Sequence, residues 1–287
     1  MTQQLLGRHV WPPQTGSAIG KAEVVDAAWQ SRRGSRGDLA LSLLSLLFFT
    51  GLLYAIWEAV SLAGTVPSFI LPTPLQVAQE LGAELSSGDL LANTAVTLQE
   101  AMGGFTLATV IAGVCGYAIA HVRPLELLAA PFIATTQAVP IVAVAPIIIL
   151  LLGPGMWPRI VTCTVVVVFP LLITTVTGLR SVERDYHNVA RVFGASRLQT
   201  LLLVELPLAS PILLGGLKLG LTLSIIGAVV GEFITSSSGL GFMINSSIAN
   251  FEAATRYAAL IALAALGMTL FGIMTLVERT LLQWRDV

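Results

Sequence analysis

The sequence predicts an all-α, polytopic membrane protein with six transmembrane helices. Hydrophobic residues make up 55% of the 287-residue chain and charged residues only 11%, whereas a soluble globular domain is about 25% charged. The mean hydropathy is +0.84. Six apolar runs of about 20 residues or more, each with at most one charge, recur along the chain. Each run is long enough to cross about 30 Å of hydrocarbon as a helix.

The apolar runs define the expected organisation of the chain. Residues 1–37 are polar and are expected to form a tail, separate from a transmembrane domain at residues 38–287. The third run contains Pro131, Pro140 and Pro146, so we expect a bent or tilted helix with an irregular entry there. The six runs are residues 39–57, 101–120, 127–158, 160–179, 211–231 and 257–277.

The basic residues predict the orientation of these runs. Twelve lie in the tail and in the loops on the same side, Arg159 and Arg256 lie on the other side, and Lys218 lies inside a run. Because basic residues near span ends accumulate in the cytoplasm, both termini are expected to be cytoplasmic. The net charge of −1 gives no indication of a nucleic-acid partner.

Several kinds of site are not expected in this chain. Cys115 and Cys163 each lie inside an apolar run and are interpreted as small buried hydrophobes, not as a disulfide or a metal pair. His9, His121 and His187 all lie outside the centres of the runs, so no histidine-based catalytic site is expected within the bilayer. The chain also lacks the G-x-x-x-x-G-K-[ST] phosphate loop, so no nucleotide-hydrolysis site of that kind is expected in this chain.

The loop at residues 180–207, on the predicted cytoplasmic side, has the pattern of two short helices joined at a glycine. Tyr186, Val189, Ala190 and Phe193 follow the i, i+3, i+4, i+7 spacing of one helix face, and Gly194 is a common helix stop. A second helix is expected to follow, with Ser196 and Gln199 forming a capping box and Pro207 at its end. Such an elbow could receive another protein surface, or it could lie on lipid as an interfacial hairpin.

This loop resembles the cytoplasmic EAA loop of ABC-importer permeases, whose consensus is E-A-A-x-x-x-G, about nine residues, then I-x-L-P. The matching residues are Asn188-Val189-Ala190, Gly194 and Val204-Glu205-Leu206-Pro207. Asn188 departs from the glutamate usual in the family, which puts a charged contact at that point in doubt. The segments QAVPIVAVAPIIILLLGPG, GLRSVERD and GEFITSSSGLGFMI resemble the nitrate, sulfonate, taurine and pyrimidine-precursor branch. The resemblance covers about residues 75–285.

The resemblance implies the type I ABC-importer permease fold and a transport function without catalysis in this chain. Two ATPase subunits that bind ATP and Mg²⁺, a second permease copy and an extracytoplasmic solute-binding protein are the implied partners. No cofactor is expected in the chain itself. The loop would contact the ATPase and transmit its motion. The residues implied for this coupling are Asn188, Val189, Ala190, Arg191, Gly194, Ala195, Leu206 and Pro207.

Polar residues at membrane depth are candidates for the translocation pathway or a gate, because such groups usually face a cavity or water. Glu232 ends the fifth run and precedes a flexible TSSSGLG segment; it could instead cap the run in interfacial water. Gly215, Gly216 and Gly220 favour close helix packing more than contact with a ligand. The pathway or gate candidates are Thr135, Thr136, Gln137, Glu232, Ser236, Ser237, Gly239 and Gly241.

An alternative function is that of a secondary transporter or channel that works without an ATPase. Such a protein would be expected to show paired intramembrane acids or internal repeats. The sequence shows no repeat, and no second acidic residue within a run pairs evidently with Glu232. The importer is therefore the favoured hypothesis. The resemblance leaves the solute open among sulfonates, taurine, nitrate and heteroaromatic vitamin precursors, with a slight preference for an aromatic precursor or a sulfonate.

Overall fold

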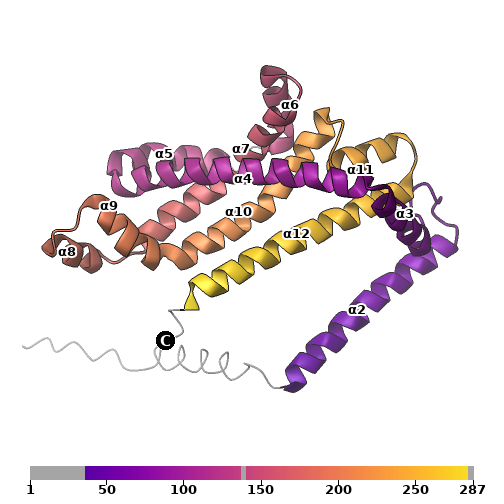
Figure 1. The fold of residues 1–287 in the computed structure, drawn as a ribbon, viewed down its shortest axis with the longest axis horizontal. Coiled ribbons are helices and arrows are strands. Elements are labelled where there is room, and N and C mark those ends of the chain that lie inside the picture. Colours follow the sequence, from indigo (N-terminus) through magenta and orange to yellow (C-terminus); the bar gives the residue numbers. More distant parts are fainter. Residues whose placement is uncertain (1–35, 137–139, 284–287) are drawn as a thin grey trace, which may run out of the picture. The chain divides into compact units, whose positions relative to one another are not determined.

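The computed structural model describes residues 36–136 and 140–283, which form helices and connecting turns and contain no strand. The predicted 1–37 tail therefore lies almost entirely outside the described residues. The chain divides into two compact units, residues 1–59 and 60–287. The elements coloured in Figure 1 are α2 (Arg36–Leu62), α3 (Pro74–Ser87), α4 (Asp89–His121), α5 (Arg123–Thr136), α6 (Ile141–Leu152), α7 (Met156–Arg180), α8 (Arg184–Val192), α9 (Arg197–Thr200), the π-helix η1 (Leu201–Glu205), α10 (Leu206–Thr235), α11 (Leu240–Ala249) and α12 (Ala253–Leu281).

Four helical segments of the described chain are long and apolar enough to cross a membrane: 89–121, 156–180, 197–235 and 253–281. They contain the second, fourth, fifth and sixth predicted spans. Helix α2 contains the first predicted span. Its residues 47–62 are apolar but form a segment shorter than the four above. The apolar segments and the all-helical architecture therefore agree with the predicted fold class.

The third predicted span is not a single helix. Helix α5 ends at Thr136 and α6 begins at Ile141, after Pro140. At a rise of 1.5 Å per residue, neither helix alone spans about 30 Å. Proline favours this break because it supplies no backbone N–H to the preceding turn and disfavours helical geometry in the residue before it. Pro131 and Pro146 are accommodated inside α5 and α6.

Helices α4, α7 and α10 pack together closely because small residues lie between them. A Cβ on Gly104 of α4 would lie 2.2 Å from Cys163 Sγ of α7, and one on Gly227 of α10 would lie 2.7 Å from the Cys163 Cα. A Cβ on Gly216 of α10 would lie 2.2 Å from Thr174 Oγ1, and one on Gly220 would lie 2.9 Å from Leu171 Cδ2, both on α7. This confirms the predicted packing role of these two glycines, whereas Gly215 has no such neighbour. Cys163 is buried as a small hydrophobe, as predicted, whereas Cys115 of α4 is exposed, so its predicted burial is wrong.

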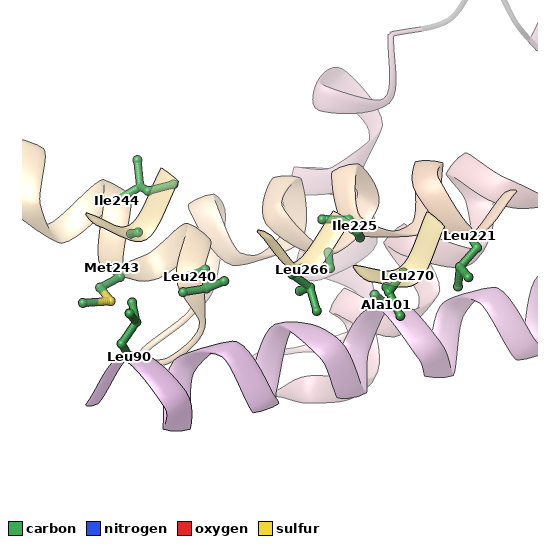
Figure 2. Close-up of a cluster of buried hydrophobic side chains, with 11 residues drawn as sticks. Leu90, Ala101, Leu221, Ile225, Leu240, Met243, Ile244, Leu266 and Leu270 are labelled. Atoms are coloured by element: carbon green, nitrogen blue, oxygen red, sulfur yellow. The ribbon is translucent and has the colours of Figure 1, made fainter. Parts of the chain in front are cut away.

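A second apolar cluster joins α4 and α10 to α11 and α12 (Figure 2). Leu240, with no exposed surface, lies at its α11 end, and Leu266 and Leu270 of α12 contribute from the middle of their helix. One end of the α4, α7 and α10 bundle carries a buried polar cluster around Glu232, and the opposite end carries the α7–α10 loop.

Candidate functional site: the α7–α10 loop, a cavity and a buried polar cluster

The loop between α7 and α10 forms the predicted helix–glycine–helix elbow. Helix α8 ends at Val192, and Gly194 has a φ of 73°, in the left-handed region that favours glycine. The Ala195 N–H donates to Ala190 O at 3.0 Å, and the Gly194 N–H donates to Arg191 O at 3.0 Å. These two bonds are the Schellman arrangement that closes a helix C-terminus. These bonds stabilise the glycine turn.

The second arm of the elbow starts with the predicted capping box. The Ser196 N–H donates to Gln199 Oε1 at 2.8 Å, and the Gln199 N–H donates to Ser196 Oγ at 3.3 Å. The helix continues through η1 into α10 without ending at Pro207, which occupies the first turn of α10 instead. The expected helix end at Pro207 is therefore wrong. Proline is tolerated in a first turn because its missing N–H is not needed there.

The elbow leaves its apolar side chains uncovered. Phe193 is 85% exposed and Val192 86% exposed, and Val189 and Tyr186 are also exposed. Of the four residues on the predicted apolar helix face, Ala190 is the one that is buried, so it faces the rest of the described chain. The other residues implied for coupling are at the surface or partly buried: Asn188, Arg191, Gly194, Ala195, Leu206 and Pro207. A contiguous exposed apolar face such as this one marks contact with another protein or with lipid.

A cavity of about 660 Å³ lies against α6, α7 and α10. Thr136 at the end of α5 and Thr174 of α7 supply hydroxyl groups to its lining, and Phe169 supplies an aromatic ring. Its other described lining residues are aliphatic or proline, and none of the lining residues carries a charge. Of the pathway candidates, Thr136 therefore lines this cavity. Thr135 is exposed, and Gln137 lies outside the described residues.

Glu232, near the end of α10, is buried to 1% exposure within a polar cluster. Its Oε1 accepts a hydrogen bond from Thr97 Oγ1 at 2.7 Å, and its Oε2 accepts one from the Gly241 N–H. The carboxylate thus connects α4, α10 and the start of α11. Glu232 does not lie in interfacial water, the second of the two positions that the sequence left open.

Two charged residues complete this cluster, and sequence reasoning missed both. Arg159 Nη1 of α7 lies 2.6 Å from Glu100 Oε1 of α4 and donates to Ser236 Oγ, and Arg159 Nε donates to Gly155 O at 3.0 Å. Neither Glu100 oxygen has a donor at hydrogen-bonding angles among the described residues. The available signal was that these opposite charges flank neighbouring apolar runs on the same predicted side.

The glycines of the TSSSGLG segment give the cluster its shape. Gly239 has a φ of 107°, and a Cβ there would lie 2.3 Å from Glu232 Cδ. A Cβ on Gly241 would lie 2.7 Å from Glu232 Oε2. Ser236 is partly buried and accepts from Arg159, whereas Ser237 is exposed. Of the pathway or gate candidates, Glu232, Ser236, Gly239 and Gly241 therefore lie together in one cluster at this end of the bundle, and the other four lie outside it or outside the described residues.

The sequence model of one family, described as "Binding-protein-dependent transport system inner membrane component", matches residues 104–283. The riboflavin transport system permease protein RibX of Chloroflexus aurantiacus is 45% identical over 86% of this chain and 89% of its own length. The formylaminopyrimidine transport permease protein ThiX of Halalkalibacterium halodurans is 28% identical over 83% of this chain and 94% of its own. A solved structure of the MetNI methionine ABC transporter in an inward-facing conformation matches with a TM-score of 0.62 and 18% identity, over 69% of this chain and 98% of that one.

Proposed function

Because the chain belongs to the family of binding-protein-dependent transport system inner membrane components and is an ABC-importer permease, we propose that its 180–207 loop receives a partner ATPase and moves the transmembrane helices. The observation that carries this proposal is the exposed apolar face of α8 and its glycine turn, with Phe193 85% and Val192 86% exposed. An aromatic anchor that enters a pocket is a common energetic centre of a protein interface. The ATP and Mg²⁺ would be bound by the partner.

The elbow transmits force because it is rigid and continuous with a long helix. The Schellman bonds fix Gly194, and the segment from Arg197 to Thr235 runs from the elbow through η1 into α10. A displacement of the exposed apolar face would therefore be carried along α10, which packs on α4, α7 and α12. Energy coupling in this scheme is a two-state element biased by a partner, and it needs no reacting group in this chain.

The assembly we propose contains two copies of this permease, two ATPase subunits and one solute-binding protein on the other side of the membrane. The family to which the chain belongs works with ATPase and solute-binding partners, and the second permease copy would close the cavity beside α6 and α7. The distribution of basic residues supports a cytoplasmic 180–207 loop and cytoplasmic termini.

For the solute we propose a small, planar, uncharged or weakly charged heteroaromatic compound. The cavity against α6, α7 and α10 combines apolar walls, one Phe169 ring and the Thr136 and Thr174 hydroxyls. Such a lining suits a stacked ring with a few hydrogen bonds. A sulfonate or nitrate ion would instead need positive or N–H donor groups to replace its hydration. The names of RibX and ThiX, which refer to riboflavin and to formylaminopyrimidine, support the same class, whereas another relative, 30% identical over 84% of this chain, is named for aliphatic sulfonate transport.

Co-purification with the cognate ATPase tests the docking proposal. Phe193→Asp places a charge at the centre of the exposed apolar face and should abolish the association, while the permease still elutes as a folded species. Leu281→Asp, at the exposed end of α12, is the matched control and should retain the ATPase. Full association of Phe193→Asp, or solute uptake by vesicles that contain this chain alone, would reject the proposal in favour of an ATPase-independent transporter.

A further inference from the structure

Three ionisable side chains converge where α4 ends and α10 begins. His121 is the last residue of α4, His187 lies in α8, and Glu205 lies in η1 immediately before α10. His121 Nε2 is 3.1 Å and His187 Nε2 is 3.2 Å from the same Glu205 Oε1. The three potential ligand atoms all lie within 4.8 Å of one another. These residues belong neither to the exposed face of α8 nor to the Glu232 cluster.

The far nitrogen of each imidazole is already committed. His121 Nδ1 lies 2.9 Å from Tyr117 O, and His187 Nδ1 lies 3.2 Å from Glu183 O. A backbone carbonyl oxygen only accepts hydrogen bonds, so each Nδ1 must carry the proton. In the neutral imidazoles the Nε2 lone pairs then point at the same carboxylate oxygen. This is an unfavourable arrangement of three lone pairs unless a proton or a metal cation lies between them.

Glu205 adds an independent observation. It is 3% exposed, and its Oε2 is buried with no hydrogen-bond partner in the described structure. A buried carboxylate oxygen without a donor is costly, since neither water nor protein replaces its hydration. Hydrogen bonds from the two Nε2 atoms would satisfy Oε1 only, and would leave Oε2 without a partner. A metal ion bound by both carboxylate oxygens would satisfy Oε2 as well as Oε1.

We infer that His121, His187 and Glu205 form a binding site for a divalent transition-metal ion, for which Zn²⁺ is the appropriate probe. Two imidazole nitrogens and one carboxylate are a common three-residue zinc ligand set that leaves a fourth position for water. Ligand bonds of about 2.0–2.2 Å in tetrahedral geometry place ligand atoms about 3.3–3.6 Å apart, close to the 3.1 and 3.2 Å found here.

The surroundings meet the other requirements of a metal site. Each histidine has the Nδ1–H···O=C bond that fixes tautomer and ring orientation in metal-binding histidines. The Tyr117 ring packs on the His121 ring, with centroids 4.2 Å apart, and further restricts its rotation. Both imidazoles are partly exposed, so an ion can reach the site from water.

A bound ion would join α8 to the transmembrane helices. His187 provides the ligand from α8, while His121 and Glu205 provide those from α4 and the start of α10. Occupancy would therefore hold the elbow against the bundle and reduce its freedom to move. The site gives this transporter subunit a means of responding to metal through the same segment that we propose receives the ATPase.

Metal binding is tested on the purified transporter complex, stripped with a chelator and titrated with Zn²⁺. We expect one high-affinity Zn²⁺ per permease chain, with X-ray absorption showing two imidazole ligands. Because loss of an outer hydrogen bond already weakens metal sites about 10–100-fold, His187→Gln and Glu205→Gln should each weaken binding by about 100-fold or more. His9→Gln, the same change at the third histidine of the chain, is the matched control and should bind like the parent.

Hydrogen–deuterium exchange provides a second readout that does not depend on transport. Zn²⁺ should slow exchange of the α8 amides in the parent and in His9→Gln, but not in His187→Gln. No high-affinity site in the parent, or a site of unchanged affinity and ligand set in His187→Gln, would overturn the inference. Phe193→Asp should lose the ATPase and keep the Zn²⁺ site, so failure of the docking proposal and failure of the metal proposal give different results.

Discussion

Arg159 of α7 and Glu100 of α4 form an ion pair at 2.6 Å in which the glutamate side chain is fully buried and the arginine side chain is 9% exposed. The same guanidinium donates to Ser236 Oγ at the end of α10. One cation therefore ties three long helices together at the end of the bundle opposite the α7–α10 loop. If α10 moves relative to α4 and α7, either the whole cluster moves as one unit or the contacts of Arg159 with Glu100 and Ser236 must break.

Removal of one partner of this pair should destabilise the protein strongly. Arg159→Ala leaves the buried Glu100 carboxylate without its cation, and breaking a buried pair in this way typically costs about 3–5 kcal/mol. The double variant Glu100→Gln, Arg159→Gln should recover part of the loss because the Glu100 charge is removed together with its cation, while the buried Glu232 of the same cluster still loses Arg159 as a neighbour. Thermal unfolding of the detergent-solubilised protein measures both. A single variant that unfolds at the parental temperature would contradict the structural role assigned to the pair.

Gly239 should not tolerate a side chain. In Gly239→Ala the new Cβ would collide with the Glu232 carboxyl group. The alanine would also have to adopt a positive φ that L-residues rarely adopt. Overpacking and backbone strain each cost about 1–3 kcal/mol, so the unfolding temperature should fall clearly. Gly113→Ala, in the middle of α4 with nothing within 4 Å, is the matched control and should be neutral or slightly stabilising. Equal unfolding temperatures for the two variants would refute the predicted clash.

Glu84 of α3 predicts a pH dependence of stability. Burial, followed by repulsion from Glu80, Asp89 and Glu252, raises the pKa of Glu84 above its ordinary value of 4.5. The folded state therefore holds this proton more tightly than the unfolded state, and its stability should decrease as the pH rises from 4.5 through the raised pKa. Glu84→Gln should be more stable than the parent above that range and equal to it below. Parallel curves of unfolding temperature against pH for the two proteins would count against this explanation.

The exposed pair of Glu126 and Arg180 should have a much smaller effect. The hydrogen bond from Arg180 lowers the pKa of Glu126, so its contribution to stability is present above the ordinary pKa and is lost as the pH falls through the lowered value. Glu126→Gln should remove this acid-side dependence and leave the unfolding temperature at neutral pH nearly unchanged, since exposed ion pairs contribute little. A large loss of stability at neutral pH would contradict the small contribution predicted for this exposed pair.

The apolar runs and the loop were predictable from sequence because local patterns determine them. Run length gives the long helices, and the Ser196–Gln199 capping box and Gly194 turn depend on residues only a few positions apart. The division of residues 127–158 into α5 and α6 was only partly predictable. Its prolines indicated an irregularity, but whether a proline bends a helix or ends it depends on the partners available to the freed backbone groups.

The buried clusters were not predictable in the same way because they join distant positions. Glu100, Arg159 and Glu232 lie far apart in the sequence, and only the packing of α4, α7 and α10 brings them together. His121 and Glu205 are separated in the same manner. Each of these residues, taken singly, has the pattern of a charge at the end of a span. Their pairing requires the register of the helices, which a single sequence does not determine.

Site-specific photo-crosslinking from position 193 tests the central claim most directly. A benzophenone side chain would replace Phe193, which is 85% exposed, in the assembled transporter, and the same group at Leu281 would serve as the control. The account predicts a covalent adduct between position 193 and the ATPase subunit, and none from position 281. Adducts from position 193 with lipid alone, or equal labelling of the ATPase from both positions, would contradict it.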